Sequence, residues 1–150
     1  MSDEPLTNAA VDRLRTGIRL ANVMQRDEFT GGALTDDFVF EDRRSGFNWG
    51  VVEASAYPEI SKSVFDVGSG RPSWSIPEVI AVRDQRIAAT VLVIDYGDGI
   101  YTDMIACVRF DPQLRLLQRR VLFDLDARDA AIALLDEWHA EIDEEPDTPS

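Results

Sequence analysis

The sequence has little of the residue chemistry that disulfides, metal centres and catalytic triads require. Its 150 residues include one cysteine, Cys107, and one histidine, His139. A lone cysteine forms no intrachain disulfide, which favours a reducing compartment such as the cytoplasm. Two soft ligands are too few for a structural zinc site, so the sequence predicts neither a metal nor any other cofactor. A serine triad could use only His139, which lies off the apolar stripe of its segment and is expected to be exposed.

Positive charge and long apolar runs are also scarce. Fifteen basic residues stand against 28 acidic ones, giving a formal net charge of −13. This balance argues against nucleic acid and anionic membrane surfaces as partners, because both require clustered Lys and Arg. No apolar run approaches the roughly 20 residues that cross a bilayer, and residues 1–6 lack the features of a signal peptide. We therefore expect a cytoplasmic protein that does not enter the membrane.

What the sequence does contain indicates one globular domain. Apolar residues make up 45% of the chain and include seven Phe, three Trp and three Tyr, a composition that excludes disorder of the whole chain. We assign residues 1–142 to a single domain. Residues 143–150 are acidic, contain two prolines and have no apolar side chain, so this segment is predicted to be a flexible tail.

Hydrophobic periodicity predicts helices first and strands later. Apolar spacings of three and four predict a helix over 7–26, and a Phe-rich segment predicts a strand over 37–43. A helix kinked by Pro58 is expected over 51–67. The period then changes to two, which predicts an antiparallel meander of strands near 75–83, 86–95, 100–110 and 114–123. A last helix, capped by Asp126, follows. This order is typical of the α+β class.

The same order resembles the cone fold of the nuclear transport factor 2-like superfamily, which includes SnoaL-like cyclases and steroid Δ-isomerases. The most specific local matches are the segments TDDFVFEDRRSG over 35–46 and VRFDPQLRLL over 108–117. The resemblance covers about residues 11–123. It implies a curved, mostly antiparallel sheet wrapped around N-terminal helices, with the C-terminal helix as an addition. It also implies a homodimer, because family members usually cover the outer sheet face by pairing sheet to sheet. The alternative is that the C-terminal helix covers part of that face.

Asp42 is the candidate catalytic residue. Strand alternation places Phe38, Phe40 and Asp42 on one face. If that face lines an apolar cavity, burial raises the pKa of a carboxyl group there and makes it a usable acid or base near neutrality. The resemblance agrees, since the isomerases carry their proton-shuttling carboxylate at the matching position. The alternative is structural, with Asp42 capping a turn or pairing with Arg43, Arg44 or another inward arginine.

The rest of the isomerase machinery is missing. The resemblance places the two oxyanion donors of that family at about Ile18 and at Ala106, and neither side chain can donate a hydrogen bond. Losing one such donor costs about a hundred- to a thousandfold in rate, so steroid isomerisation is not expected. Tyr101 and Asp103 share one face of their strand and form a possible substitute pair, or else a solvated edge.

Arginines and aromatic residues provide the remaining candidates. Arg109 and Arg119 lie in strands rich in Ile, Val and Leu, where a guanidinium needs a carboxylate partner or an anionic ligand. If Arg119 faces the cavity with Asp42, a carboxylate-bearing or phenolic ligand is expected. The candidate walls for a flat apolar ligand, which could equally plug the cone, are Trp49, Tyr57 and Trp74. Cys107 is interpreted as core packing.

These observations favour a protein that binds a small, largely apolar or aromatic molecule in the cone, with Asp42 as its main polar group. One alternative is a cofactor-independent cyclase, isomerase or hydrolase that uses Asp42 as acid or base. The other is a regulatory or dimerisation module whose cone is filled by its own side chains.

Overall fold

The computed structural model describes residues 6–24, 34–45, 50–57, 59 and 72–145, and the structural statements below concern these residues. Two long helices and six strands follow in the order α1 (Ala9–Met24), β1 (Leu34–Asp42), β2 (Gly50–Glu53), β3 (Ser73–Arg83), β4 (Ile87–Gly97), β5 (Ile100–Phe110), β6 (Leu117–Phe123) and α3 (Arg128–Asp143). The predicted α+β class is confirmed. None of these helices is long and apolar enough to span a bilayer.

The six strands form one sheet in the order β2-β1-β6-β5-β4-β3. The predicted meander is confirmed, because β3, β4, β5 and β6 pair antiparallel with their neighbours in sequence. At the tight turn between β4 and β5, Gly97, Asp98 and Gly99 all have positive φ angles, of 84°, 58° and 79°, which two glycines accommodate without strain. Strand β1 joins the other side of the meander by pairing parallel with β6, and β2 completes that edge.

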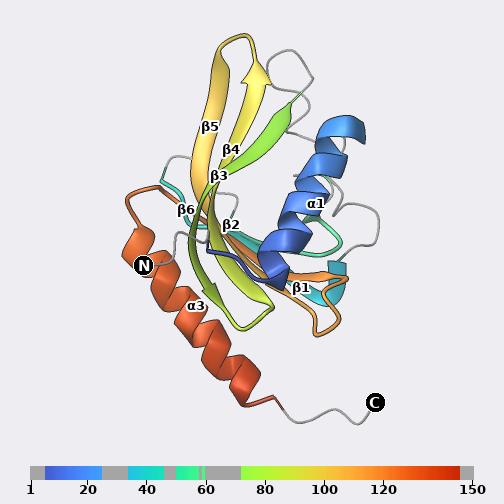
Figure 1. The fold of residues 1–150 in the computed structure, drawn as a ribbon, viewed down its shortest axis with the longest axis vertical. Helices are drawn as coiled ribbons and strands as arrows, with labels where there is room; N and C mark the ends of the chain where they lie inside the picture. Colours follow the sequence, from blue (N-terminus) through green and yellow to red (C-terminus); the bar gives the residue numbers. More distant parts are fainter. Residues whose placement is uncertain (1–5, 25–33, 46–49, 58, 60–71, 146–150) are drawn as a thin grey trace.

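Helices cover both faces of the sheet (Figure 1). Alternation along β4 divides the core: Ala88 belongs to the cluster beneath α1, whereas Ala89 belongs to the cluster beneath α3. We call these two surfaces the α1 face and the α3 face. Both helices contact β3, β4 and β5, so parts of these strands are covered on both sides.

Asparagines fix α1 over its face at two points. Asn8 caps the helix, since its Oδ1 accepts the Val11 N–H at 3.0 Å, and its Nδ2 donates to the carbonyls of Asp84 and Ile87, both at 2.9 Å. One asparagine thus satisfies the helix start and ties it to the β3–β4 turn. Near the other end, Asn22 and the Trp74 backbone exchange two hydrogen bonds, at 2.7 and 3.0 Å. These two contacts fix the distance between the sheet and the part of α1 that lies between them.

Helix α3 lies across the opposite face. Ala131, Leu134, Leu135 and Trp138 pack on the sheet, as the spacing of these residues predicts. Its C-terminal end is held by ion pairs, because Glu145 contacts Arg86 at 2.9 Å and Arg109 at 2.8 Å. Glu145 falls within the segment that the sequence assigns to a flexible tail, and here it anchors the helix end. The remainder of that segment, residues 146–150, lies outside the described residues.

Two local predictions are wrong. The first part of the helix expected over 51–67 is replaced by the short strand β2 and a turn at 54–56. Tyr57 and Glu59 are helical, as expected for a second part that begins near Pro58, and residues 58 and 60–67 lie outside the described residues. The β-branched pair Val51 and Val52 suits an edge strand beside β1, and this pairing outweighs the four-residue spacing. Asp126 does not cap α3, whose N-cap is Ala127 without a side-chain hydrogen bond.

Candidate functional site

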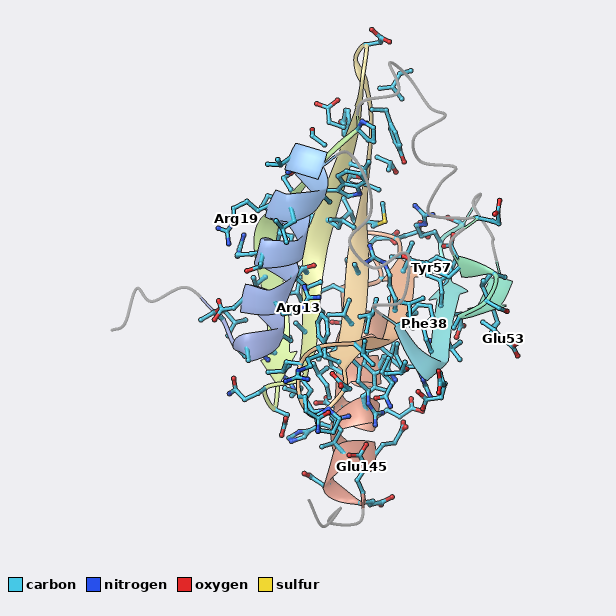
Figure 2. The ribbon with its side chains drawn as sticks, turned by 90° about the vertical axis from the view of Figure 1, so that its right-hand side faces the viewer. Arg13, Arg19, Phe38, Glu53, Tyr57 and Glu145 are labelled. Carbon is cyan, nitrogen blue, oxygen red and sulfur yellow. The ribbon has the colours of Figure 1, made fainter. Side chains whose placement is uncertain are left out.

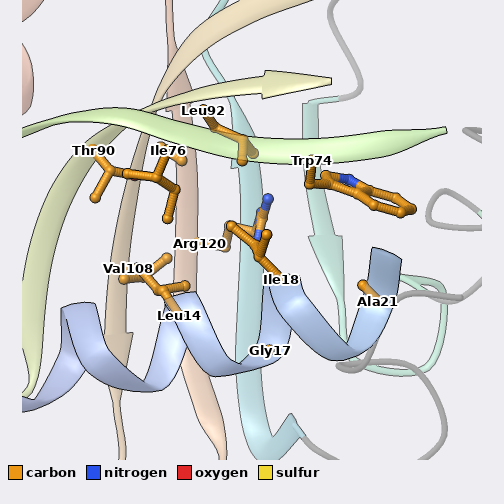
Figure 3. A pocket seen from close by; sticks show the side chains of 11 residues that line it. Leu14, Gly17, Ile18, Ala21, Trp74, Ile76, Thr90, Leu92, Val108 and Arg120 are labelled. Atoms are coloured by element: carbon orange, nitrogen blue, oxygen red, sulfur yellow. The ribbon is translucent and has the colours of Figure 1, made fainter. Parts of the chain in front are cut away.

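A pocket lies between α1 and the α1 face of the sheet (Figure 3). Helix α1 contributes Leu14, Gly17, Ile18 and Ala21. Gly17 and Ala21 are small, so the helix leaves space beneath it. The strands contribute Trp74, Ile76, Thr90, Leu92, Ala106, Val108 and Arg120. The cavity volume is about 30 Å³, which corresponds to about two water molecules. The pocket therefore exists as a narrow apolar slot beneath the helix.

Only two of the lining side chains other than Trp74 are polar. Thr90 lies on β4, and Arg120 lies on β6 with Phe40 and Val108 as its cross-strand neighbours. Figure 3 shows the nitrogen end of Arg120 directed into the pocket. Within the described part of the chain, neither side chain forms a hydrogen bond or an ion pair. The slot therefore holds an uncompensated cation among apolar groups.

Arg120 differs in this respect from the comparable arginines of the protein. Each of the other described arginines that is buried or partly buried has a partner. The ion-paired ones are Arg44 with Asp42, Arg83 with Asp136, Arg86 and Arg109 with Glu145, and Arg119 with Asp37, while Arg13 lies over the Phe110 ring. Arg120 is itself partly exposed. Its guanidinium is therefore free of protein partners in the described structure and available to pair with an anionic group of a ligand.

Asp42 is buried on the same face and is engaged by a neighbouring residue. Phe38, Phe40 and Asp42 are 1%, 2% and 3% exposed, so the alternation predicted for β1 is present. The Arg44 guanidinium donates from Nε to Oδ1 and from its terminal nitrogen to Oδ2, both at 2.9 Å, and the Arg44 backbone N–H donates to Oδ1 at 3.0 Å. Both carboxylate oxygens are thus occupied by a bidentate pair. This is the structural alternative raised for Asp42.

Three of the six aromatic candidates, Phe38, Phe40 and Tyr57, pack against one another. The ring centroids of Phe38 and Phe40 lie 5.0 and 5.2 Å from that of Tyr57. Figure 2 shows Phe38 and Tyr57 together at the β1–β2 end of the molecule, away from α1. Trp74 lines the pocket, whereas Trp49 lies outside the described residues. The aromatic plug and the slot beneath α1 are therefore two separate parts of one core.

The other predicted ligand-binding residues lie away from the slot. Tyr101 is 67% exposed near the tip of the β4–β5 hairpin, and Asp103 is exposed on the same strand. Arg119 donates to the Asp37 carbonyl at 2.7 Å. It precedes Arg120 in β6 and therefore faces the other side of the sheet. Arg109 is 5% exposed and pairs with Glu141 and Glu145 of the C-terminal segment, so it satisfies the predicted need for a carboxylate.

Arg120 and Thr90 are the pocket residues that sequence reasoning missed. The signal was the position of each beside apolar residues on strands of the meander: Arg120 lies two residues before Leu122, and Thr90 two before Leu92. Both leucines belong to the core cluster beneath α1. Deciding which of two adjacent arginines faced the cavity required knowing which strand face lay beneath α1.

The buried thiol provides no nucleophile. Desolvation raises the pKa of Cys107 to about 12, against a small opposing effect of Arg43, and Cys107 is fully buried beneath α3. Nowhere in the described ranges do three His, Cys, Asp or Glu side chains converge as metal ligands would. The arrangement offers an apolar slot of small volume with one guanidinium that can pair with a negative charge.

Comparisons with known proteins bear on the fold. No protein-family model and no curated protein matches the sequence. Among solved structures, the Δ5-3-ketosteroid isomerase from Mycobacterium sp. matches with a TM-score of 0.56 and 17% identity, over 81% of this chain and 97% of that one. RV0760c from Mycobacterium tuberculosis, in complex with estradiol-17β-hemisuccinate, matches with a TM-score of 0.56 and 16% identity, over 80% and 97%.

A third match is a nuclear transport factor 2-like protein of unknown function from Cytophaga hutchinsonii, with a TM-score of 0.52 and 11% identity, over 87% of this chain and 98% of that one. At these identities the likeness is one of fold. It extends over nearly the whole length of each of the three neighbours.

Proposed function

Because this chain has the cone fold of nuclear transport factor 2-like proteins, we propose that it binds a small, largely apolar molecule in the slot between α1 and the sheet. The observation that carries the proposal is the slot itself, nine of whose eleven lining residues are apolar or glycine. Ligand sites are typically apolar concavities with a few placed polar groups. The names of the neighbours add support, since one is a steroid isomerase and another is complexed with a steroid ester.

The enclosed volume is smaller than an apolar ligand, so some lining side chains must move when a ligand binds. Ile18, Trp74 and Arg120 line the slot and are partly exposed, so these three side chains form its solvent side. Rotation of exposed side chains is fast, on a timescale of nanoseconds or less. We place the entrance between Ile18 on α1 and Trp74 on β3, beside the Asn22 hydrogen bonds that hold this end of the helix.

Binding is better supported than catalysis. Asp42 does not line the slot, and the Arg44 guanidinium holds both of its oxygens. The positions that the isomerase resemblance assigns to the oxyanion donors, Ile18 and Ala106, do line the slot and offer no side-chain donor. An isomerase or cyclase using Asp42 is the second candidate, favoured by the burial of that carboxylate on the α1 face, and it requires Arg44 to release Asp42.

The homodimer stays a prediction. Its premise was an outer sheet face that needed cover, and α3 covers β3, β4 and β5 on that face. Sedimentation velocity at micromolar protein measures the subunit count directly. A single species with the mass of one chain would remove the dimer from the proposal without affecting the slot.

Blocking the slot tests the binding proposal. Ala21→Leu adds a large side chain to the slot from α1, whereas Ala133→Leu adds the same atoms on the exposed side of α3. Wild-type protein and the Ala133→Leu variant should enhance the fluorescence of the uncharged apolar dye N-phenyl-1-naphthylamine, and Ala21→Leu should weaken its binding at least about tenfold by removing the space it fills. Equal binding by both variants, or none by the wild type, would contradict the proposal and favour the assembly module with a filled cone.

A further inference from the structure

We infer that the ligand of the slot carries one carboxylate, which pairs with Arg120. The inference rests on the proposed binding function and adds the chemical class of the ligand: an apolar body ending in a single negative charge. Its basis is the unpartnered guanidinium described above, together with the lack of charge on the other described residues that line the slot.

Strand register holds Arg120 inside the apolar row. Its cross-strand neighbours on the α1 face are Phe40 on β1 and Val108 on β5, and neither offers a hydrogen-bond acceptor from its side chain. Adjacent strands lie about 4.8 Å apart, so both neighbours flank the side chain closely. The backbone of β6 is paired on both sides, which fixes the direction in which the side chain leaves the sheet.

The chain has 28 acidic residues. None of those described forms an ion pair with Arg120. Asp42 lies one row along the same face, opposite Leu122, but Arg44 occupies both of its oxygens. Asp37 pairs with Arg119 on the other side of β6. The chain has a net charge of −13, and yet no described carboxylate neutralises the guanidinium in the slot. An anionic ligand would supply the missing counter-charge.

The surroundings favour a carboxylate over a phosphate. A carboxylate matches the planar guanidinium fork with two parallel hydrogen bonds and one charge. A phosphate brings nearly two charges, and among the described lining residues Arg120 is the one cation available. Apart from Trp74, the other polar lining side chain is Thr90, whose hydroxyl can donate one further hydrogen bond. The rest of the slot would meet the apolar body.

The net negative charge of the protein makes a preference for an anionic ligand over a neutral one informative. A strongly acidic protein repels anions in general, so tighter binding of an anion than of its neutral counterpart requires a local cation. Decanoate and 1-decanol have the same chain length and differ at the head group. We would measure both by displacement of N-phenyl-1-naphthylamine from the full chain, and expect decanoate to bind about ten- to a hundredfold more tightly.

Two adjacent arginines provide matched variants. Arg120→Met removes the cation from the slot while retaining its apolar stem, and Arg120→Gln serves if the first variant does not fold. Arg119→Met removes the same charge from the neighbouring residue on the opposite face. We expect the Arg120 variants to bind the two compounds equally and Arg119→Met to keep the preference for decanoate. Thermal unfolding monitored by circular dichroism verifies that each variant is folded.

The outcomes separate the two proposals. Wild-type protein that binds the dye and both compounds with equal affinity would overturn the carboxylate inference and leave the apolar binding site standing. A preference that survives in Arg120→Met, or is lost in Arg119→Met, would assign the charge to a different residue and overturn the inference as well. Failure to bind the dye and both compounds would overturn the binding function itself.

Discussion

Among single residues, Asp42 has the environment that most restricts its role. Its side chain is fully buried, and that of Arg44 is 11% exposed. A buried pair of this kind is costly to break because the remaining partner is left as an uncompensated charge. The bidentate contact therefore makes Asp42 a structural anchor at the end of β1, where the chain leaves the sheet.

Asp42→Asn should destabilise the protein by about 3 kcal/mol, because the Arg44 guanidinium then lacks its counter-charge. Urea unfolding followed by circular dichroism measures this change. Glu41→Gln is the matched control on the other face, where the Glu41–Arg43 pair is 31% and 43% exposed and contributes no more than about 1 kcal/mol. An Asp42→Asn protein as stable as the control would show that the anchor is unimportant and would reopen the acid–base role.

The Cys107 thiol should be inert in the native state. Burial raises its pKa to about 12, and since the thiolate is the reactive form, alkylation at pH 8 is suppressed both by protonation and by lack of access. We expect iodoacetamide to label the protein only after denaturant unfolds it, as measured by intact mass. Rapid labelling without denaturant would show that α3 opens readily above the thiol.

The position of Arg120 shows why residue-level prediction fell short. The predicted cavity role of Arg119 depends on its facing Asp42, and adjacent residues on a strand face opposite sides, so only one of the two arginines lies on the slot face. Val121 and Leu122 are both apolar and both buried, and alternation therefore gives no sign of which face holds the slot. For β1, in contrast, Phe38 and Phe40 alternate with Val39 and Glu41, and the buried face could be predicted.

At the scale of elements, α3 is the addition that most changes the molecule. It covers the sheet with a row of apolar side chains, of which Leu135 is fully buried. Leu135→Ala should cost about 2–5 kcal/mol because it leaves a cavity between helix and sheet. Leu125→Ala, at a position 42% exposed just before the helix, should stay within about 0.5 kcal/mol. Equal effects of the two substitutions on the urea midpoint would contradict the packing of α3.

The ion pairs at the end of α3 predict a pH dependence. Hydrogen bonding and the charges of Arg86 and Arg109 lower the pKa of Glu145 below its ordinary 4.5. A lowered folded-state pKa contributes stability that is fully present above pH 4.5 and is lost as the pH falls through the folded value. Glu145→Gln should therefore flatten the loss of thermal stability on acidification. Glu144→Gln, which removes a neighbouring carboxylate without an ion pair in the described structure, should leave the slope unchanged; similar slopes for both variants would contradict the contact.

The strand β2 marks the limit of element prediction. The apolar residues of 51–67 recur every four positions, which is the helical period, and a strand of four residues is too short to display a period of two. Its pairing partner, β1, precedes it across an intervening loop. The long strands of the meander were predicted correctly because ten or so residues and their polar turns establish the period by themselves.

On the scale of the whole molecule, the sheet is a layer between two helices. Strands covered on both sides are apolar on both faces, and this is why β4 and β5 contain near-continuous hydrophobic runs. The fold class could be predicted because it follows from the order of periods along the chain. The position of the site could not, because it depends on how α1 is set above the sheet by Asn8 and Asn22, which are contacts between distant segments.

Removing α3 should expose the α3 face and cause self-association. A chain that ends at Asp126 leaves Ile105, Val121 and Phe123 without cover, and apolar patches of this kind promote association. Sedimentation velocity should show species larger than those of the full chain at the same concentration. An unchanged sedimentation coefficient per chain, with native circular dichroism, would contradict the covering role of the helix.

The parallel pairing of β1 with β6 also has a consequence for synthesis. Ribosomes add about 5–20 residues per second, and β1 emerges several seconds before the strand that it must join. The edge of β1 that pairs with β6 therefore stays unpaired, and the part of the slot that Arg120 contributes is absent, until β6 has been translated. Delayed closure of this kind exposes a nascent chain to chaperones.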